Sequence, residues 1–189
     1  MAYLNRKVKV HFIGIGGIGM SGLAEILIHL GHEVSGSDLN SNQTTKKLTN
    51  LGAEIFLGHS ADNIKDATII VFSSAIKEDN PEIINAKSKN IPLMKRAEML
   101  AEIMRLKKGI AIAGTHGKTT TTSLLSTILE ESSYDPTYLI GGVVSNLKGH
   151  AKVGNGEWIV AEVDESDGTF LLFDPIMSVI TNIDLDHMD

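Results

Sequence analysis

Two glycine-rich segments, each placed between an apolar run and a helical pattern, constrain this chain more than any other feature. The first is GIGGIG at residues 14–19, a G-x-G-x-x-G that follows the apolar residues 8–13. The second is AGTHGKTT at residues 113–120, which follows the apolar residues 110–113. A glycine-rich turn from a buried strand into a helix is typical of parallel α/β sheets that bind phosphate groups. We therefore predict two such units in one chain.

Short β-rich runs alternate with helical patterns along the whole chain, which predicts an α/β fold with a mostly parallel sheet. The expected strands are residues 8–13, 33–37, 67–72, a short strand beginning at 92, 110–113, 157–163 and 177–183. The expected helices are residues 18–30, 44–51, 80–90, 96–106 and 119–131. Two charges and a glycine, Lys107-Lys108-Gly109, separate a helix from a new strand. We therefore expect one domain over residues 1–106 and a second over 107–189.

The first loop has the glycines that a nucleotide diphosphate would need. Gly14 permits a tight turn, Gly16 lets the backbone approach a diphosphate, and Gly19 lets the helix pack close to the strand. Asp38 closes the next strand, where an acid can accept hydrogen bonds from ribose hydroxyls or can be a solvated turn residue. NAD is the default ligand for such a loop, although the geometry suits any diphosphate.

The second loop resembles a P-loop in a shortened form, because the usual first glycine position holds Ile112 and Gly114 stands closer in. Its backbone N–H groups would cradle phosphates, Lys118 would reach the β/γ oxygens and Thr119 would hold Mg²⁺. The alternative is a threonine-rich helix cap. Acidic residues follow two apolar strands, at 162–167 and 184–189. They would either hold a cation at the carboxyl ends of the strands or form solvated loops.

Composition excludes several classes of function. The chain has 17 basic and 23 acidic residues, so its net charge of −6 argues against nucleic acid as a partner. No apolar run reaches the ~18 residues that span a membrane. The absence of cysteine excludes disulfides and thiol chemistry and fits a reducing compartment. We expect a cytoplasmic protein with no membrane partner.

Seven motifs match one known family. They are GIGGIGMSG at 14–22, GSD at 36–38, SSAI at 73–76, RAEML at 96–100, GTHGKTTTT at 114–122, EVDESD at 162–167 and the residues Asn182 and 186–189 (DHMD). Together they resemble the Mur ligases over the whole length of the chain. The resemblance implies a Rossmann-like, parallel-sheet UDP-binding domain, followed by part of a P-loop ATPase α/β domain.

The resemblance also implies the ligands and the residues that bind them. The UDP part of UDP-N-acetylmuramate, rather than NAD, would be bound by Gly14, Gly16, Gly17, Gly19, Asp38 and Ser74. ATP would be bound by Gly114, Thr115, His116, Gly117, Lys118, Thr119 and Thr120. Thr119 and Glu162 would hold one Mg²⁺ and His187 would help to hold a second, and Lys118 and His187 would serve catalysis. Glu162 is preferred to Glu165 by its spacing from Lys118, while the roles of Asp38, His116 and Glu165 stay open.

The implied reaction is the ATP-dependent joining of L-alanine to UDP-N-acetylmuramate through an acyl phosphate, a step of peptidoglycan and cell-wall synthesis. The alternatives are a ligase that recycles murein tripeptide and shares GTHGKT, an NAD-linked oxidoreductase, and a non-catalytic nucleotide-binding module. The family has three domains. We therefore expect the carboxy-terminal domain to be missing here, the central one to be partial, and the 189 residues to form no product alone.

Overall fold

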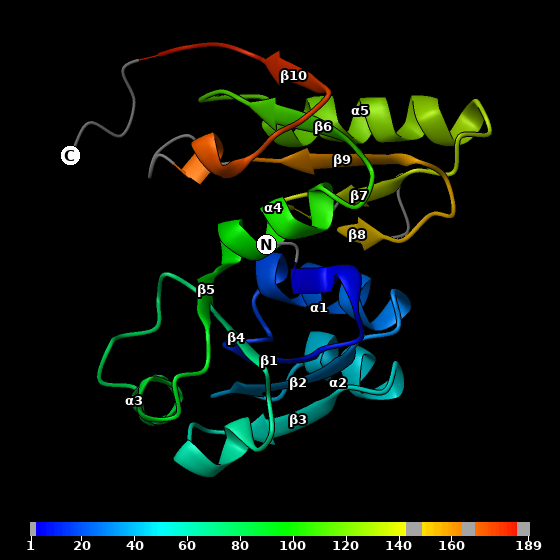
Figure 1. Cartoon of the computed structure of the whole chain (residues 1–189). Helices are drawn as coiled ribbons and strands as arrows, with labels where there is room; N and C mark the ends of the chain where they lie inside the picture. The colour runs from blue at the N-terminus through cyan, green and yellow to red at the C-terminus, as the bar shows by residue number, and fades with distance from the viewer. Residues whose placement is uncertain (1–2, 143–148, 164–168, 185–189) are drawn as a thin grey trace. The chain divides into compact units, whose positions relative to one another are not determined.

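The computed structural model describes residues 3–142, 149–163 and 169–184, and the chain divides into two compact units, Met1–Met99 and Leu100–Asp189 (Figure 1). Within the described residues, each unit holds a five-stranded sheet. The predicted α/β class is therefore confirmed. The functional boundary expected after residue 106 stays a prediction. None of the helices in the described ranges is long and apolar enough to cross a membrane.

The sheet of the first unit has the order β3-β2-β1-β4-β5, and its paired strands are all parallel. The strands are β1 (Lys9–Ile13), β2 (Glu33–Asp38), β3 (Glu54–Leu57), β4 (Ile69–Phe72) and β5 (Leu93–Lys95). The chain runs outward from β1 to β3 and returns to β4. This reversal creates the switch point at which parallel sheets bind ligands beyond the carboxyl ends of their strands.

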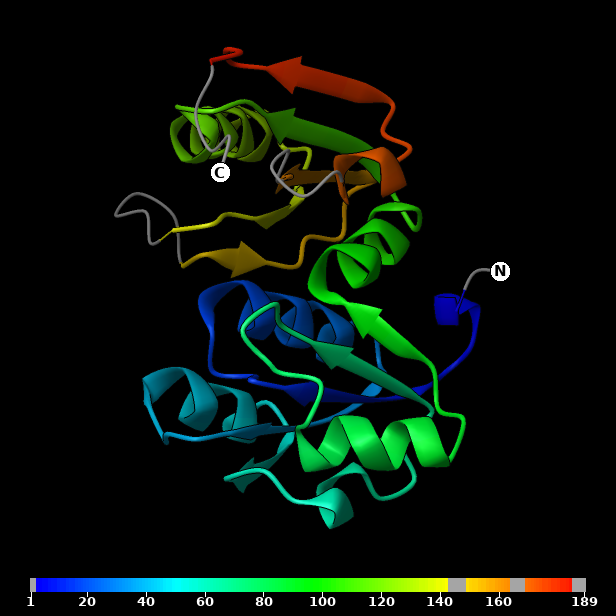
Figure 2. The same cartoon turned by 90° about the vertical axis from the view of Figure 1, so that its left-hand side faces the viewer.

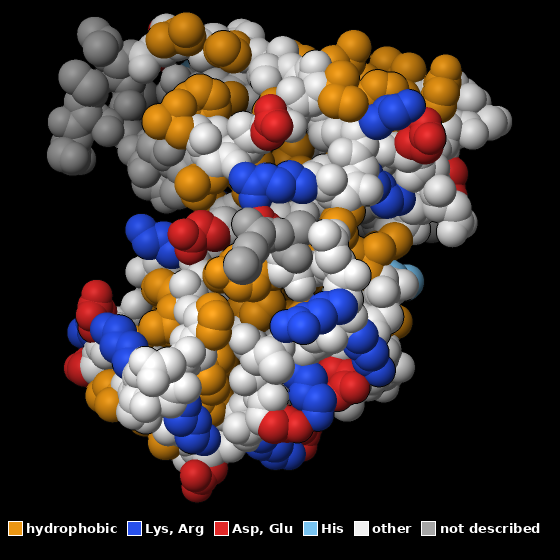
Figure 3. All heavy atoms as spheres, in the orientation of Figure 1, with side chains coloured by type: hydrophobic (Ala, Val, Ile, Leu, Met, Phe, Trp, Pro, Cys, Tyr) orange, Lys and Arg blue, Asp and Glu red, His pale blue; other side chains and the backbone are white. Residues whose placement is uncertain are grey.

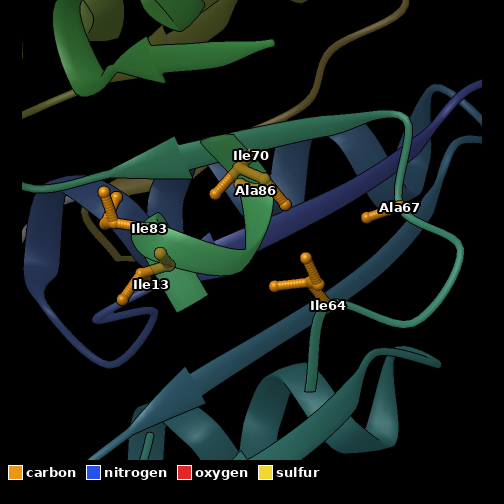
Figure 4. Packing of buried hydrophobic residues seen from close by; sticks show 6 residues of the cluster. All are labelled: Ile13, Ile64, Ala67, Ile70, Ile83 and Ala86. Atoms are coloured by element: carbon orange, nitrogen blue, oxygen red, sulfur yellow. The ribbon is translucent and has the colours of Figure 1, made fainter. Parts of the chain in front are cut away.

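Helices cover both faces of this sheet, as right-handed crossovers require when the winding direction reverses. The elements are η1 (Tyr3–Asn5), α1 (Ile18–His29), α2 (Gln43–Asn50), η2 (Ala61–Ile64) and α3 (Pro81–Ser88), with α4 (Arg96–Met104) following β5. Figure 2 shows α1 and α3 on opposite sides of β1. Beneath α3, a core cluster of Ile13, Ile64, Ala67, Ile70, Ile83 and Ala86 joins β1, β4, η2 and α3 (Figure 4).

The sheet of the second unit has the order β10-β6-β9-β7-β8, and only the pair β7–β8 is antiparallel among the described pairings. Its strands are β6 (Lys108–Ala113), β7 (Thr137–Leu139), β8 (Ala151–Lys152), β9 (Trp158–Glu162) and β10 (Met177–Ile180). The short helix η3 (Thr169–Leu172) precedes β10. One helix, α5 (Lys118–Glu131), packs Leu125 and Leu129 against a cluster that includes Ile110, Ile112 and Val160.

Apolar side chains also reach the surface of this unit. Leu124 and Ile128 on α5 and Met177 and Ile180 on β10 are each more than half exposed. Figure 3 shows hydrophobic side chains gathered over the part of the surface formed by α5 and β10. In the described residues β10 pairs only with β6 and forms an edge of the sheet.

Three strands of the structure were not predicted from the sequence. They are β3, β7 and β8, of four, three and two residues. Segments this short show no clear alternation of apolar and polar residues, and β3 in addition has no fully buried residue. The expected strand 177–183 ends at Ile180. The N–H of Thr181 still donates to the carbonyl of Ala113 at the end of β6, while the side chains of Thr181 and Asn182 bond the second glycine loop.

The buried carboxylate of Glu82 connects several elements near the edge of the first sheet where β2 ends. Glu82, near the start of α3, is fully buried, and its carboxylate accepts hydrogen bonds from Ser37 Oγ at 2.6 Å and Asn63 Nδ2 at 2.6 Å. His59 Nδ1 lies 3.1 Å from the same carboxylate, and His11 Nε2 lies 3.7 Å from it. These contacts join α3 to the end of β2 and to the segment after β3.

The polar neighbours of Glu82 lower the pKa of its carboxyl group and thereby favour the ionised form. Burial raises the pKa of its carboxyl group, but the His11 imidazole, the Ser37 hydroxyl and the Asn63 amide lower it more, from an ordinary 4.5 to about 2. Because the folded pKa is depressed, the ionised carboxylate stabilises the fold by about 3 kcal/mol above pH 4.5. This contribution is lost as the pH falls through about 2.

We predict that Glu82→Gln destabilises the first unit by about 3 kcal/mol at pH 7, since the amide cannot accept from all of these donors. The difference from the wild type should shrink as the pH falls from 5 toward 2. Urea titrations followed by amide NMR signals of residues 3–99 would measure it. Glu78→Gln is the matched control, because the Glu78 side chain is 90% exposed and pairs only at the surface with Lys87. A difference that stayed constant with pH would contradict the assignment.

Candidate functional site

The first loop leaves β1 through a backbone turn that requires glycine. Gly14 has φ +81°, and the N–H groups of Gly14 and Ile15 both donate to the Ser37 carbonyl at the end of β2, at 2.8 and 3.0 Å. Gly17 is the N-cap of α1 and has no side chain that could accept from the N–H groups of the helix. The first turn of a helix has N–H groups with no partner inside the helix, so this end can accept an anion. The turn role predicted for Gly14 is confirmed.

The other two glycines make room for side chains. A Cβ at Gly16 would lie 2.8 Å from Asp38 Oδ2 and 3.1 Å from Asn42 Nδ2. A Cβ at Gly19 would lie 3.0 Å from the Cδ of Arg96, the first residue of α4. The nearest side chain to a Cβ at Gly19 is thus that of Arg96, whereas the sequence predicted close packing on the strand. This places a cation beside the N-terminal turn of α1.

Asp38 lies directly at the loop. Its Oδ2 accepts from the N–H of Gly16 at 2.8 Å, and its Oδ1 accepts from the N–H of Asn40 at 3.0 Å. The Asp38 carbonyl also accepts from the N–H of Gly58, the residue before His59. Asp38 therefore joins the ends of β2 and β3 to the first loop. Its predicted contact with ribose stays a prediction.

The turn after β4 also borders the first loop. A Cβ at Gly14 would lie 3.5 Å from Ser73 Oγ and 3.7 Å from Ile76 Cδ1. Ser74, which the sequence singled out, is an exposed residue of the same turn. Asn42, Ser73, His59 and Arg96 are the residues at this edge that sequence reasoning did not assign. Ser73 and Arg96 lie within two of the family motifs, and Asn42 follows the predicted strand 33–37, which were the available signals. His59 follows β3, a strand that the sequence did not predict.

The second loop has the form of a P-loop. Gly114 has φ +122° and Gly117 has φ +84°, and Gly117 is the N-cap of α5. A Cβ at Gly114 would lie 2.2 Å from Thr181 Oγ1 and 2.9 Å from the Asn182 carbonyl oxygen. Both glycines are therefore required, Gly114 by conformation and space and Gly117 by conformation alone. Lys118, the first residue of α5, donates from Nζ to the carbonyl of Gly114, so its ammonium group lies over the loop.

Parallel strands bring two further segments to this loop. Ile112 on β6 pairs with Glu162 at the end of β9, and Ala113 pairs with Ile180 at the end of β10. The loop thus lies between the two strand ends, as predicted. After β10, Thr181 Oγ1 donates to the His116 carbonyl at 2.6 Å, and Asn182 bonds both the N–H and the carbonyl of His116 at 3.0 and 2.9 Å. Sequence reasoning gave these two residues no role.

Oxygen atoms that could bind a cation lie beside the P-loop. Thr119 Oγ1 lies 3.4 Å from Glu162 Oε2, and a Cβ at Gly141 would lie 2.5 Å from that oxygen. Glu162 Oε1 is buried and has no hydrogen-bond partner among the described residues. A buried carboxylate oxygen without a donor is costly unless a cation binds it. Hard oxygen ligands suit Mg²⁺, so the residues fit this ion.

Two residues considered for the site lie outside the described ranges. They are His187, proposed for Mg²⁺ and catalysis, and Glu165, whose role was left open. Among the residues that the structure describes, no cluster of three or more His, Asp or Glu side chains is arranged for a metal.

Fold and site together define a class: an α/β protein with a P-loop in one unit and a separate dinucleotide-type glycine loop in the other. Residues 9–119 match the description "Mur ligase family, catalytic domain", and residues 112–189 match the Mur ligase middle domain. The chain belongs to the Mur ligase family.

The curated relatives that it matches are longer proteins. UDP-N-acetylmuramate–L-alanine ligase of Janthinobacterium sp. (strain Marseille) is 59% identical over 187 residues, which cover 98% of this chain and 40% of that protein. The ligase of the same name from Geobacter sp. (strain M21) is 57% identical over 181 residues, covering 96% of this chain and 39% of that protein. The chain thus spans about 40% of the length of these relatives.

Two solved structures share the fold. UDP-N-acetylmuramate-alanine ligase from Thermotoga maritima has a TM-score of 0.87 at 38% identity, covering 96% of this chain and 43% of that chain. The UDP-N-acetylmuramate:L-alanyl-gamma-D-glutamyl-meso-diaminopimelate ligase from Neisseria meningitides also has a TM-score of 0.87, at 30% identity, covering 97% of this chain and 63% of that chain.

We predict that Gly114→Ala lowers the unfolding free energy of the second unit by at least about 2 kcal/mol, because alanine is strained at this φ and its Cβ would overlap Thr181 Oγ1. Urea unfolding followed by the fluorescence of Trp158, which is the single tryptophan of the chain and lies on β9, measures this unit. Gly142→Ala is the matched control, since its nearest contact would be an ordinary 3.6 Å to Thr119 Cγ2. Equal stabilities of the two variants would show that the loop conformation differs from the one described.

Proposed function

We propose that this chain is the nucleotide-binding part of a ligase that joins L-alanine to UDP-N-acetylmuramate with hydrolysis of ATP, in peptidoglycan precursor synthesis. The observation that carries the proposal is the second loop, which is a P-loop with Thr119 and Glu162 beside it. One carboxylate oxygen of Glu162 is buried without a hydrogen-bond partner among the described residues. Relatives at 56–59% identity over almost the whole chain, all named for this reaction, support the choice of L-alanine. The proposed substrates, ATP and a UDP-linked sugar, place the reaction in the cytoplasm.

The division of labour follows the two units. We assign residues 1–106 to the UDP-sugar and residues 107–189 to ATP. The loop of Gly14, Gly16, Gly17 and Gly19, with Asp38 and Ser74, would bind the diphosphate and ribose of the UDP-sugar. An NAD-linked oxidoreductase would leave the second loop and Glu162 without a function. The murein tripeptide ligase is the second candidate, because its structure matches with an equal TM-score.

In the second unit, the residues 114–120 would surround the triphosphate. The muramate carboxylate would attack the γ-phosphorus of ATP, with ADP leaving, to give an acyl phosphate. The amine of L-alanine would then attack the acyl carbon and displace inorganic phosphate, losing a proton as the amide forms. Lys118 would turn from the Gly114 carbonyl toward the β/γ-phosphates and neutralise their charge. Thr119 and Glu162 would hold one Mg²⁺ and His187 would help to hold a second; Mg²⁺ supplies charge neutralisation when bound. The protein contributes positioning more than covalent chemistry.

We expect Lys118→Ala to weaken ATP binding in the presence of Mg²⁺ by at least tenfold, because a charge-assisted hydrogen bond contributes about 1.5–3 kcal/mol. In a full-length enzyme carrying the same change, turnover should be abolished, since loss of such a donor costs roughly 3–4 kcal/mol of transition-state stabilisation. Calorimetry with UDP-N-acetylmuramate should show unchanged affinity.

The reciprocal variant is Gly16→Ala, whose Cβ would displace the Asp38 carboxylate from the first loop. It should weaken UDP-N-acetylmuramate binding and leave ATP binding unchanged. Loss of UDP-sugar affinity in Lys118→Ala would refute the assignment of one ligand to each unit.

We also predict that the 189 residues alone bind both ligands and form no product, because they match about 40% of the length of the active relatives. An assay for ADP and phosphate, run with ATP, L-alanine and UDP-N-acetylmuramate, tests this. Product formation above the background without L-alanine would show that these residues suffice for catalysis.

A further inference from the structure

The segment after β10 contacts the P-loop mainly through the backbone of one residue, His116. Asn182 Oδ1 accepts from the N–H of His116 at 3.0 Å, and Asn182 Nδ2 donates to the carbonyl oxygen of His116 at 2.9 Å. Thr181 Oγ1 also donates to that oxygen, at 2.6 Å. Beside them, the N–H of Asp184 donates to Thr115 Oγ1 at 3.3 Å. The segment therefore bonds two successive residues of the loop.

The chemistry of this contact is specific to a carboxamide. One planar amide group satisfies both the donor and the acceptor of the His116 residue, which fixes the direction of the adjoining backbone. A carboxylate could accept from the N–H but would repel the carbonyl, and an aliphatic side chain could do neither. The loop needs such support, because Gly114 and Gly117 have the positive φ values of a conformation that chain entropy disfavours.

The direction of the His116 N–H has a consequence for the ligand. Because it donates to Asn182, we expect a phosphate to be bound instead by N–H groups of the first turn of α5, which follows the N-cap Gly117. Fixing the backbone on both sides of His116 would orient these groups before any phosphate arrives. Preorganisation of this kind increases affinity, because the cost of ordering the loop is not paid on binding.

We propose that Asn182 is a positioning residue for ATP: its carboxamide holds both the N–H and the carbonyl of His116 and thereby keeps the P-loop in its phosphate-binding shape. The proposal rests on the proposed function of the loop as an ATP site. It assigns Asn182 no contact with ATP.

The test compares Asn182→Ala and Asn182→Asp with wild type in the 189-residue chain. Calorimetry with ATP and Mg²⁺ should show a roughly 10- to 100-fold loss of affinity for both variants, as expected when two hydrogen bonds are lost or one is replaced by repulsion. Asn155→Ala is the matched control, because Asn155 lies in the same unit and bonds Asp135 instead of the P-loop. Its ATP affinity should equal that of wild type.

Hydrogen exchange of the His116 amide separates positioning from a general effect on stability. Asn182→Asp keeps the acceptor, so the His116 N–H should stay protected, whereas Asn182→Ala should expose it. The urea midpoint of Trp158 fluorescence and the affinity for UDP-N-acetylmuramate report whether both units remain folded.

Two results would overturn the inference. Folded Asn182→Ala that binds ATP within threefold of wild type would show that the contact does not position the loop. A wild-type chain that binds UDP-N-acetylmuramate but no ATP would overturn the proposed function of the second loop, and the inference with it. In that case the His116 exchange rates would still show whether the hydrogen bond exists.

Discussion

The parallel register of β6 with β9 and β10 is the constraint on which the second site depends. Because Ile112 pairs with Glu162 and Ala113 pairs with Ile180, both neighbouring strands end level with the start of the P-loop. A shift of two residues in either strand would remove Glu162 from Thr119 or Asn182 from His116. The buried apolar residues of β6 and β9 resist such a shift, since it would leave cavities in the core beneath α5.

The first unit holds its glycine loop through different interactions. There the end of β2 supplies both the Ser37 carbonyl that accepts from the first loop and the Asp38 carboxylate that accepts from Gly16. The buried Glu82 network then fixes Ser37 and His59 from the opposite side. The loop of the first unit is thus held by a carboxylate and backbone groups, whereas the P-loop of the second is held by a carboxamide and a hydroxyl.

Much of this arrangement could be predicted from the sequence. The long strands β1, β6 and β9 and the helices α1 and α5 have strong apolar patterns, and the glycines of both loops mark the turns between them. The short strands β3, β7 and β8 could not be predicted in this way, because their pairing is decided by neighbouring strands and not by their own few residues. The contact between Thr119 and Glu162 was anticipated, while the Glu82 network and the Asn182 contact were not.

The sequence by itself determined the two βα loops, the α/β class and the residue types available for phosphate and cation binding, since these depend on local patterns and on glycine conformations. Only the tertiary structure decided which side chains meet. Asn182 is 66 positions from His116 along the chain, and Glu82 is 45 from Ser37. Such contacts depend on strand order and register, which are set by the packing of the whole sheet and leave no local pattern in the residues themselves.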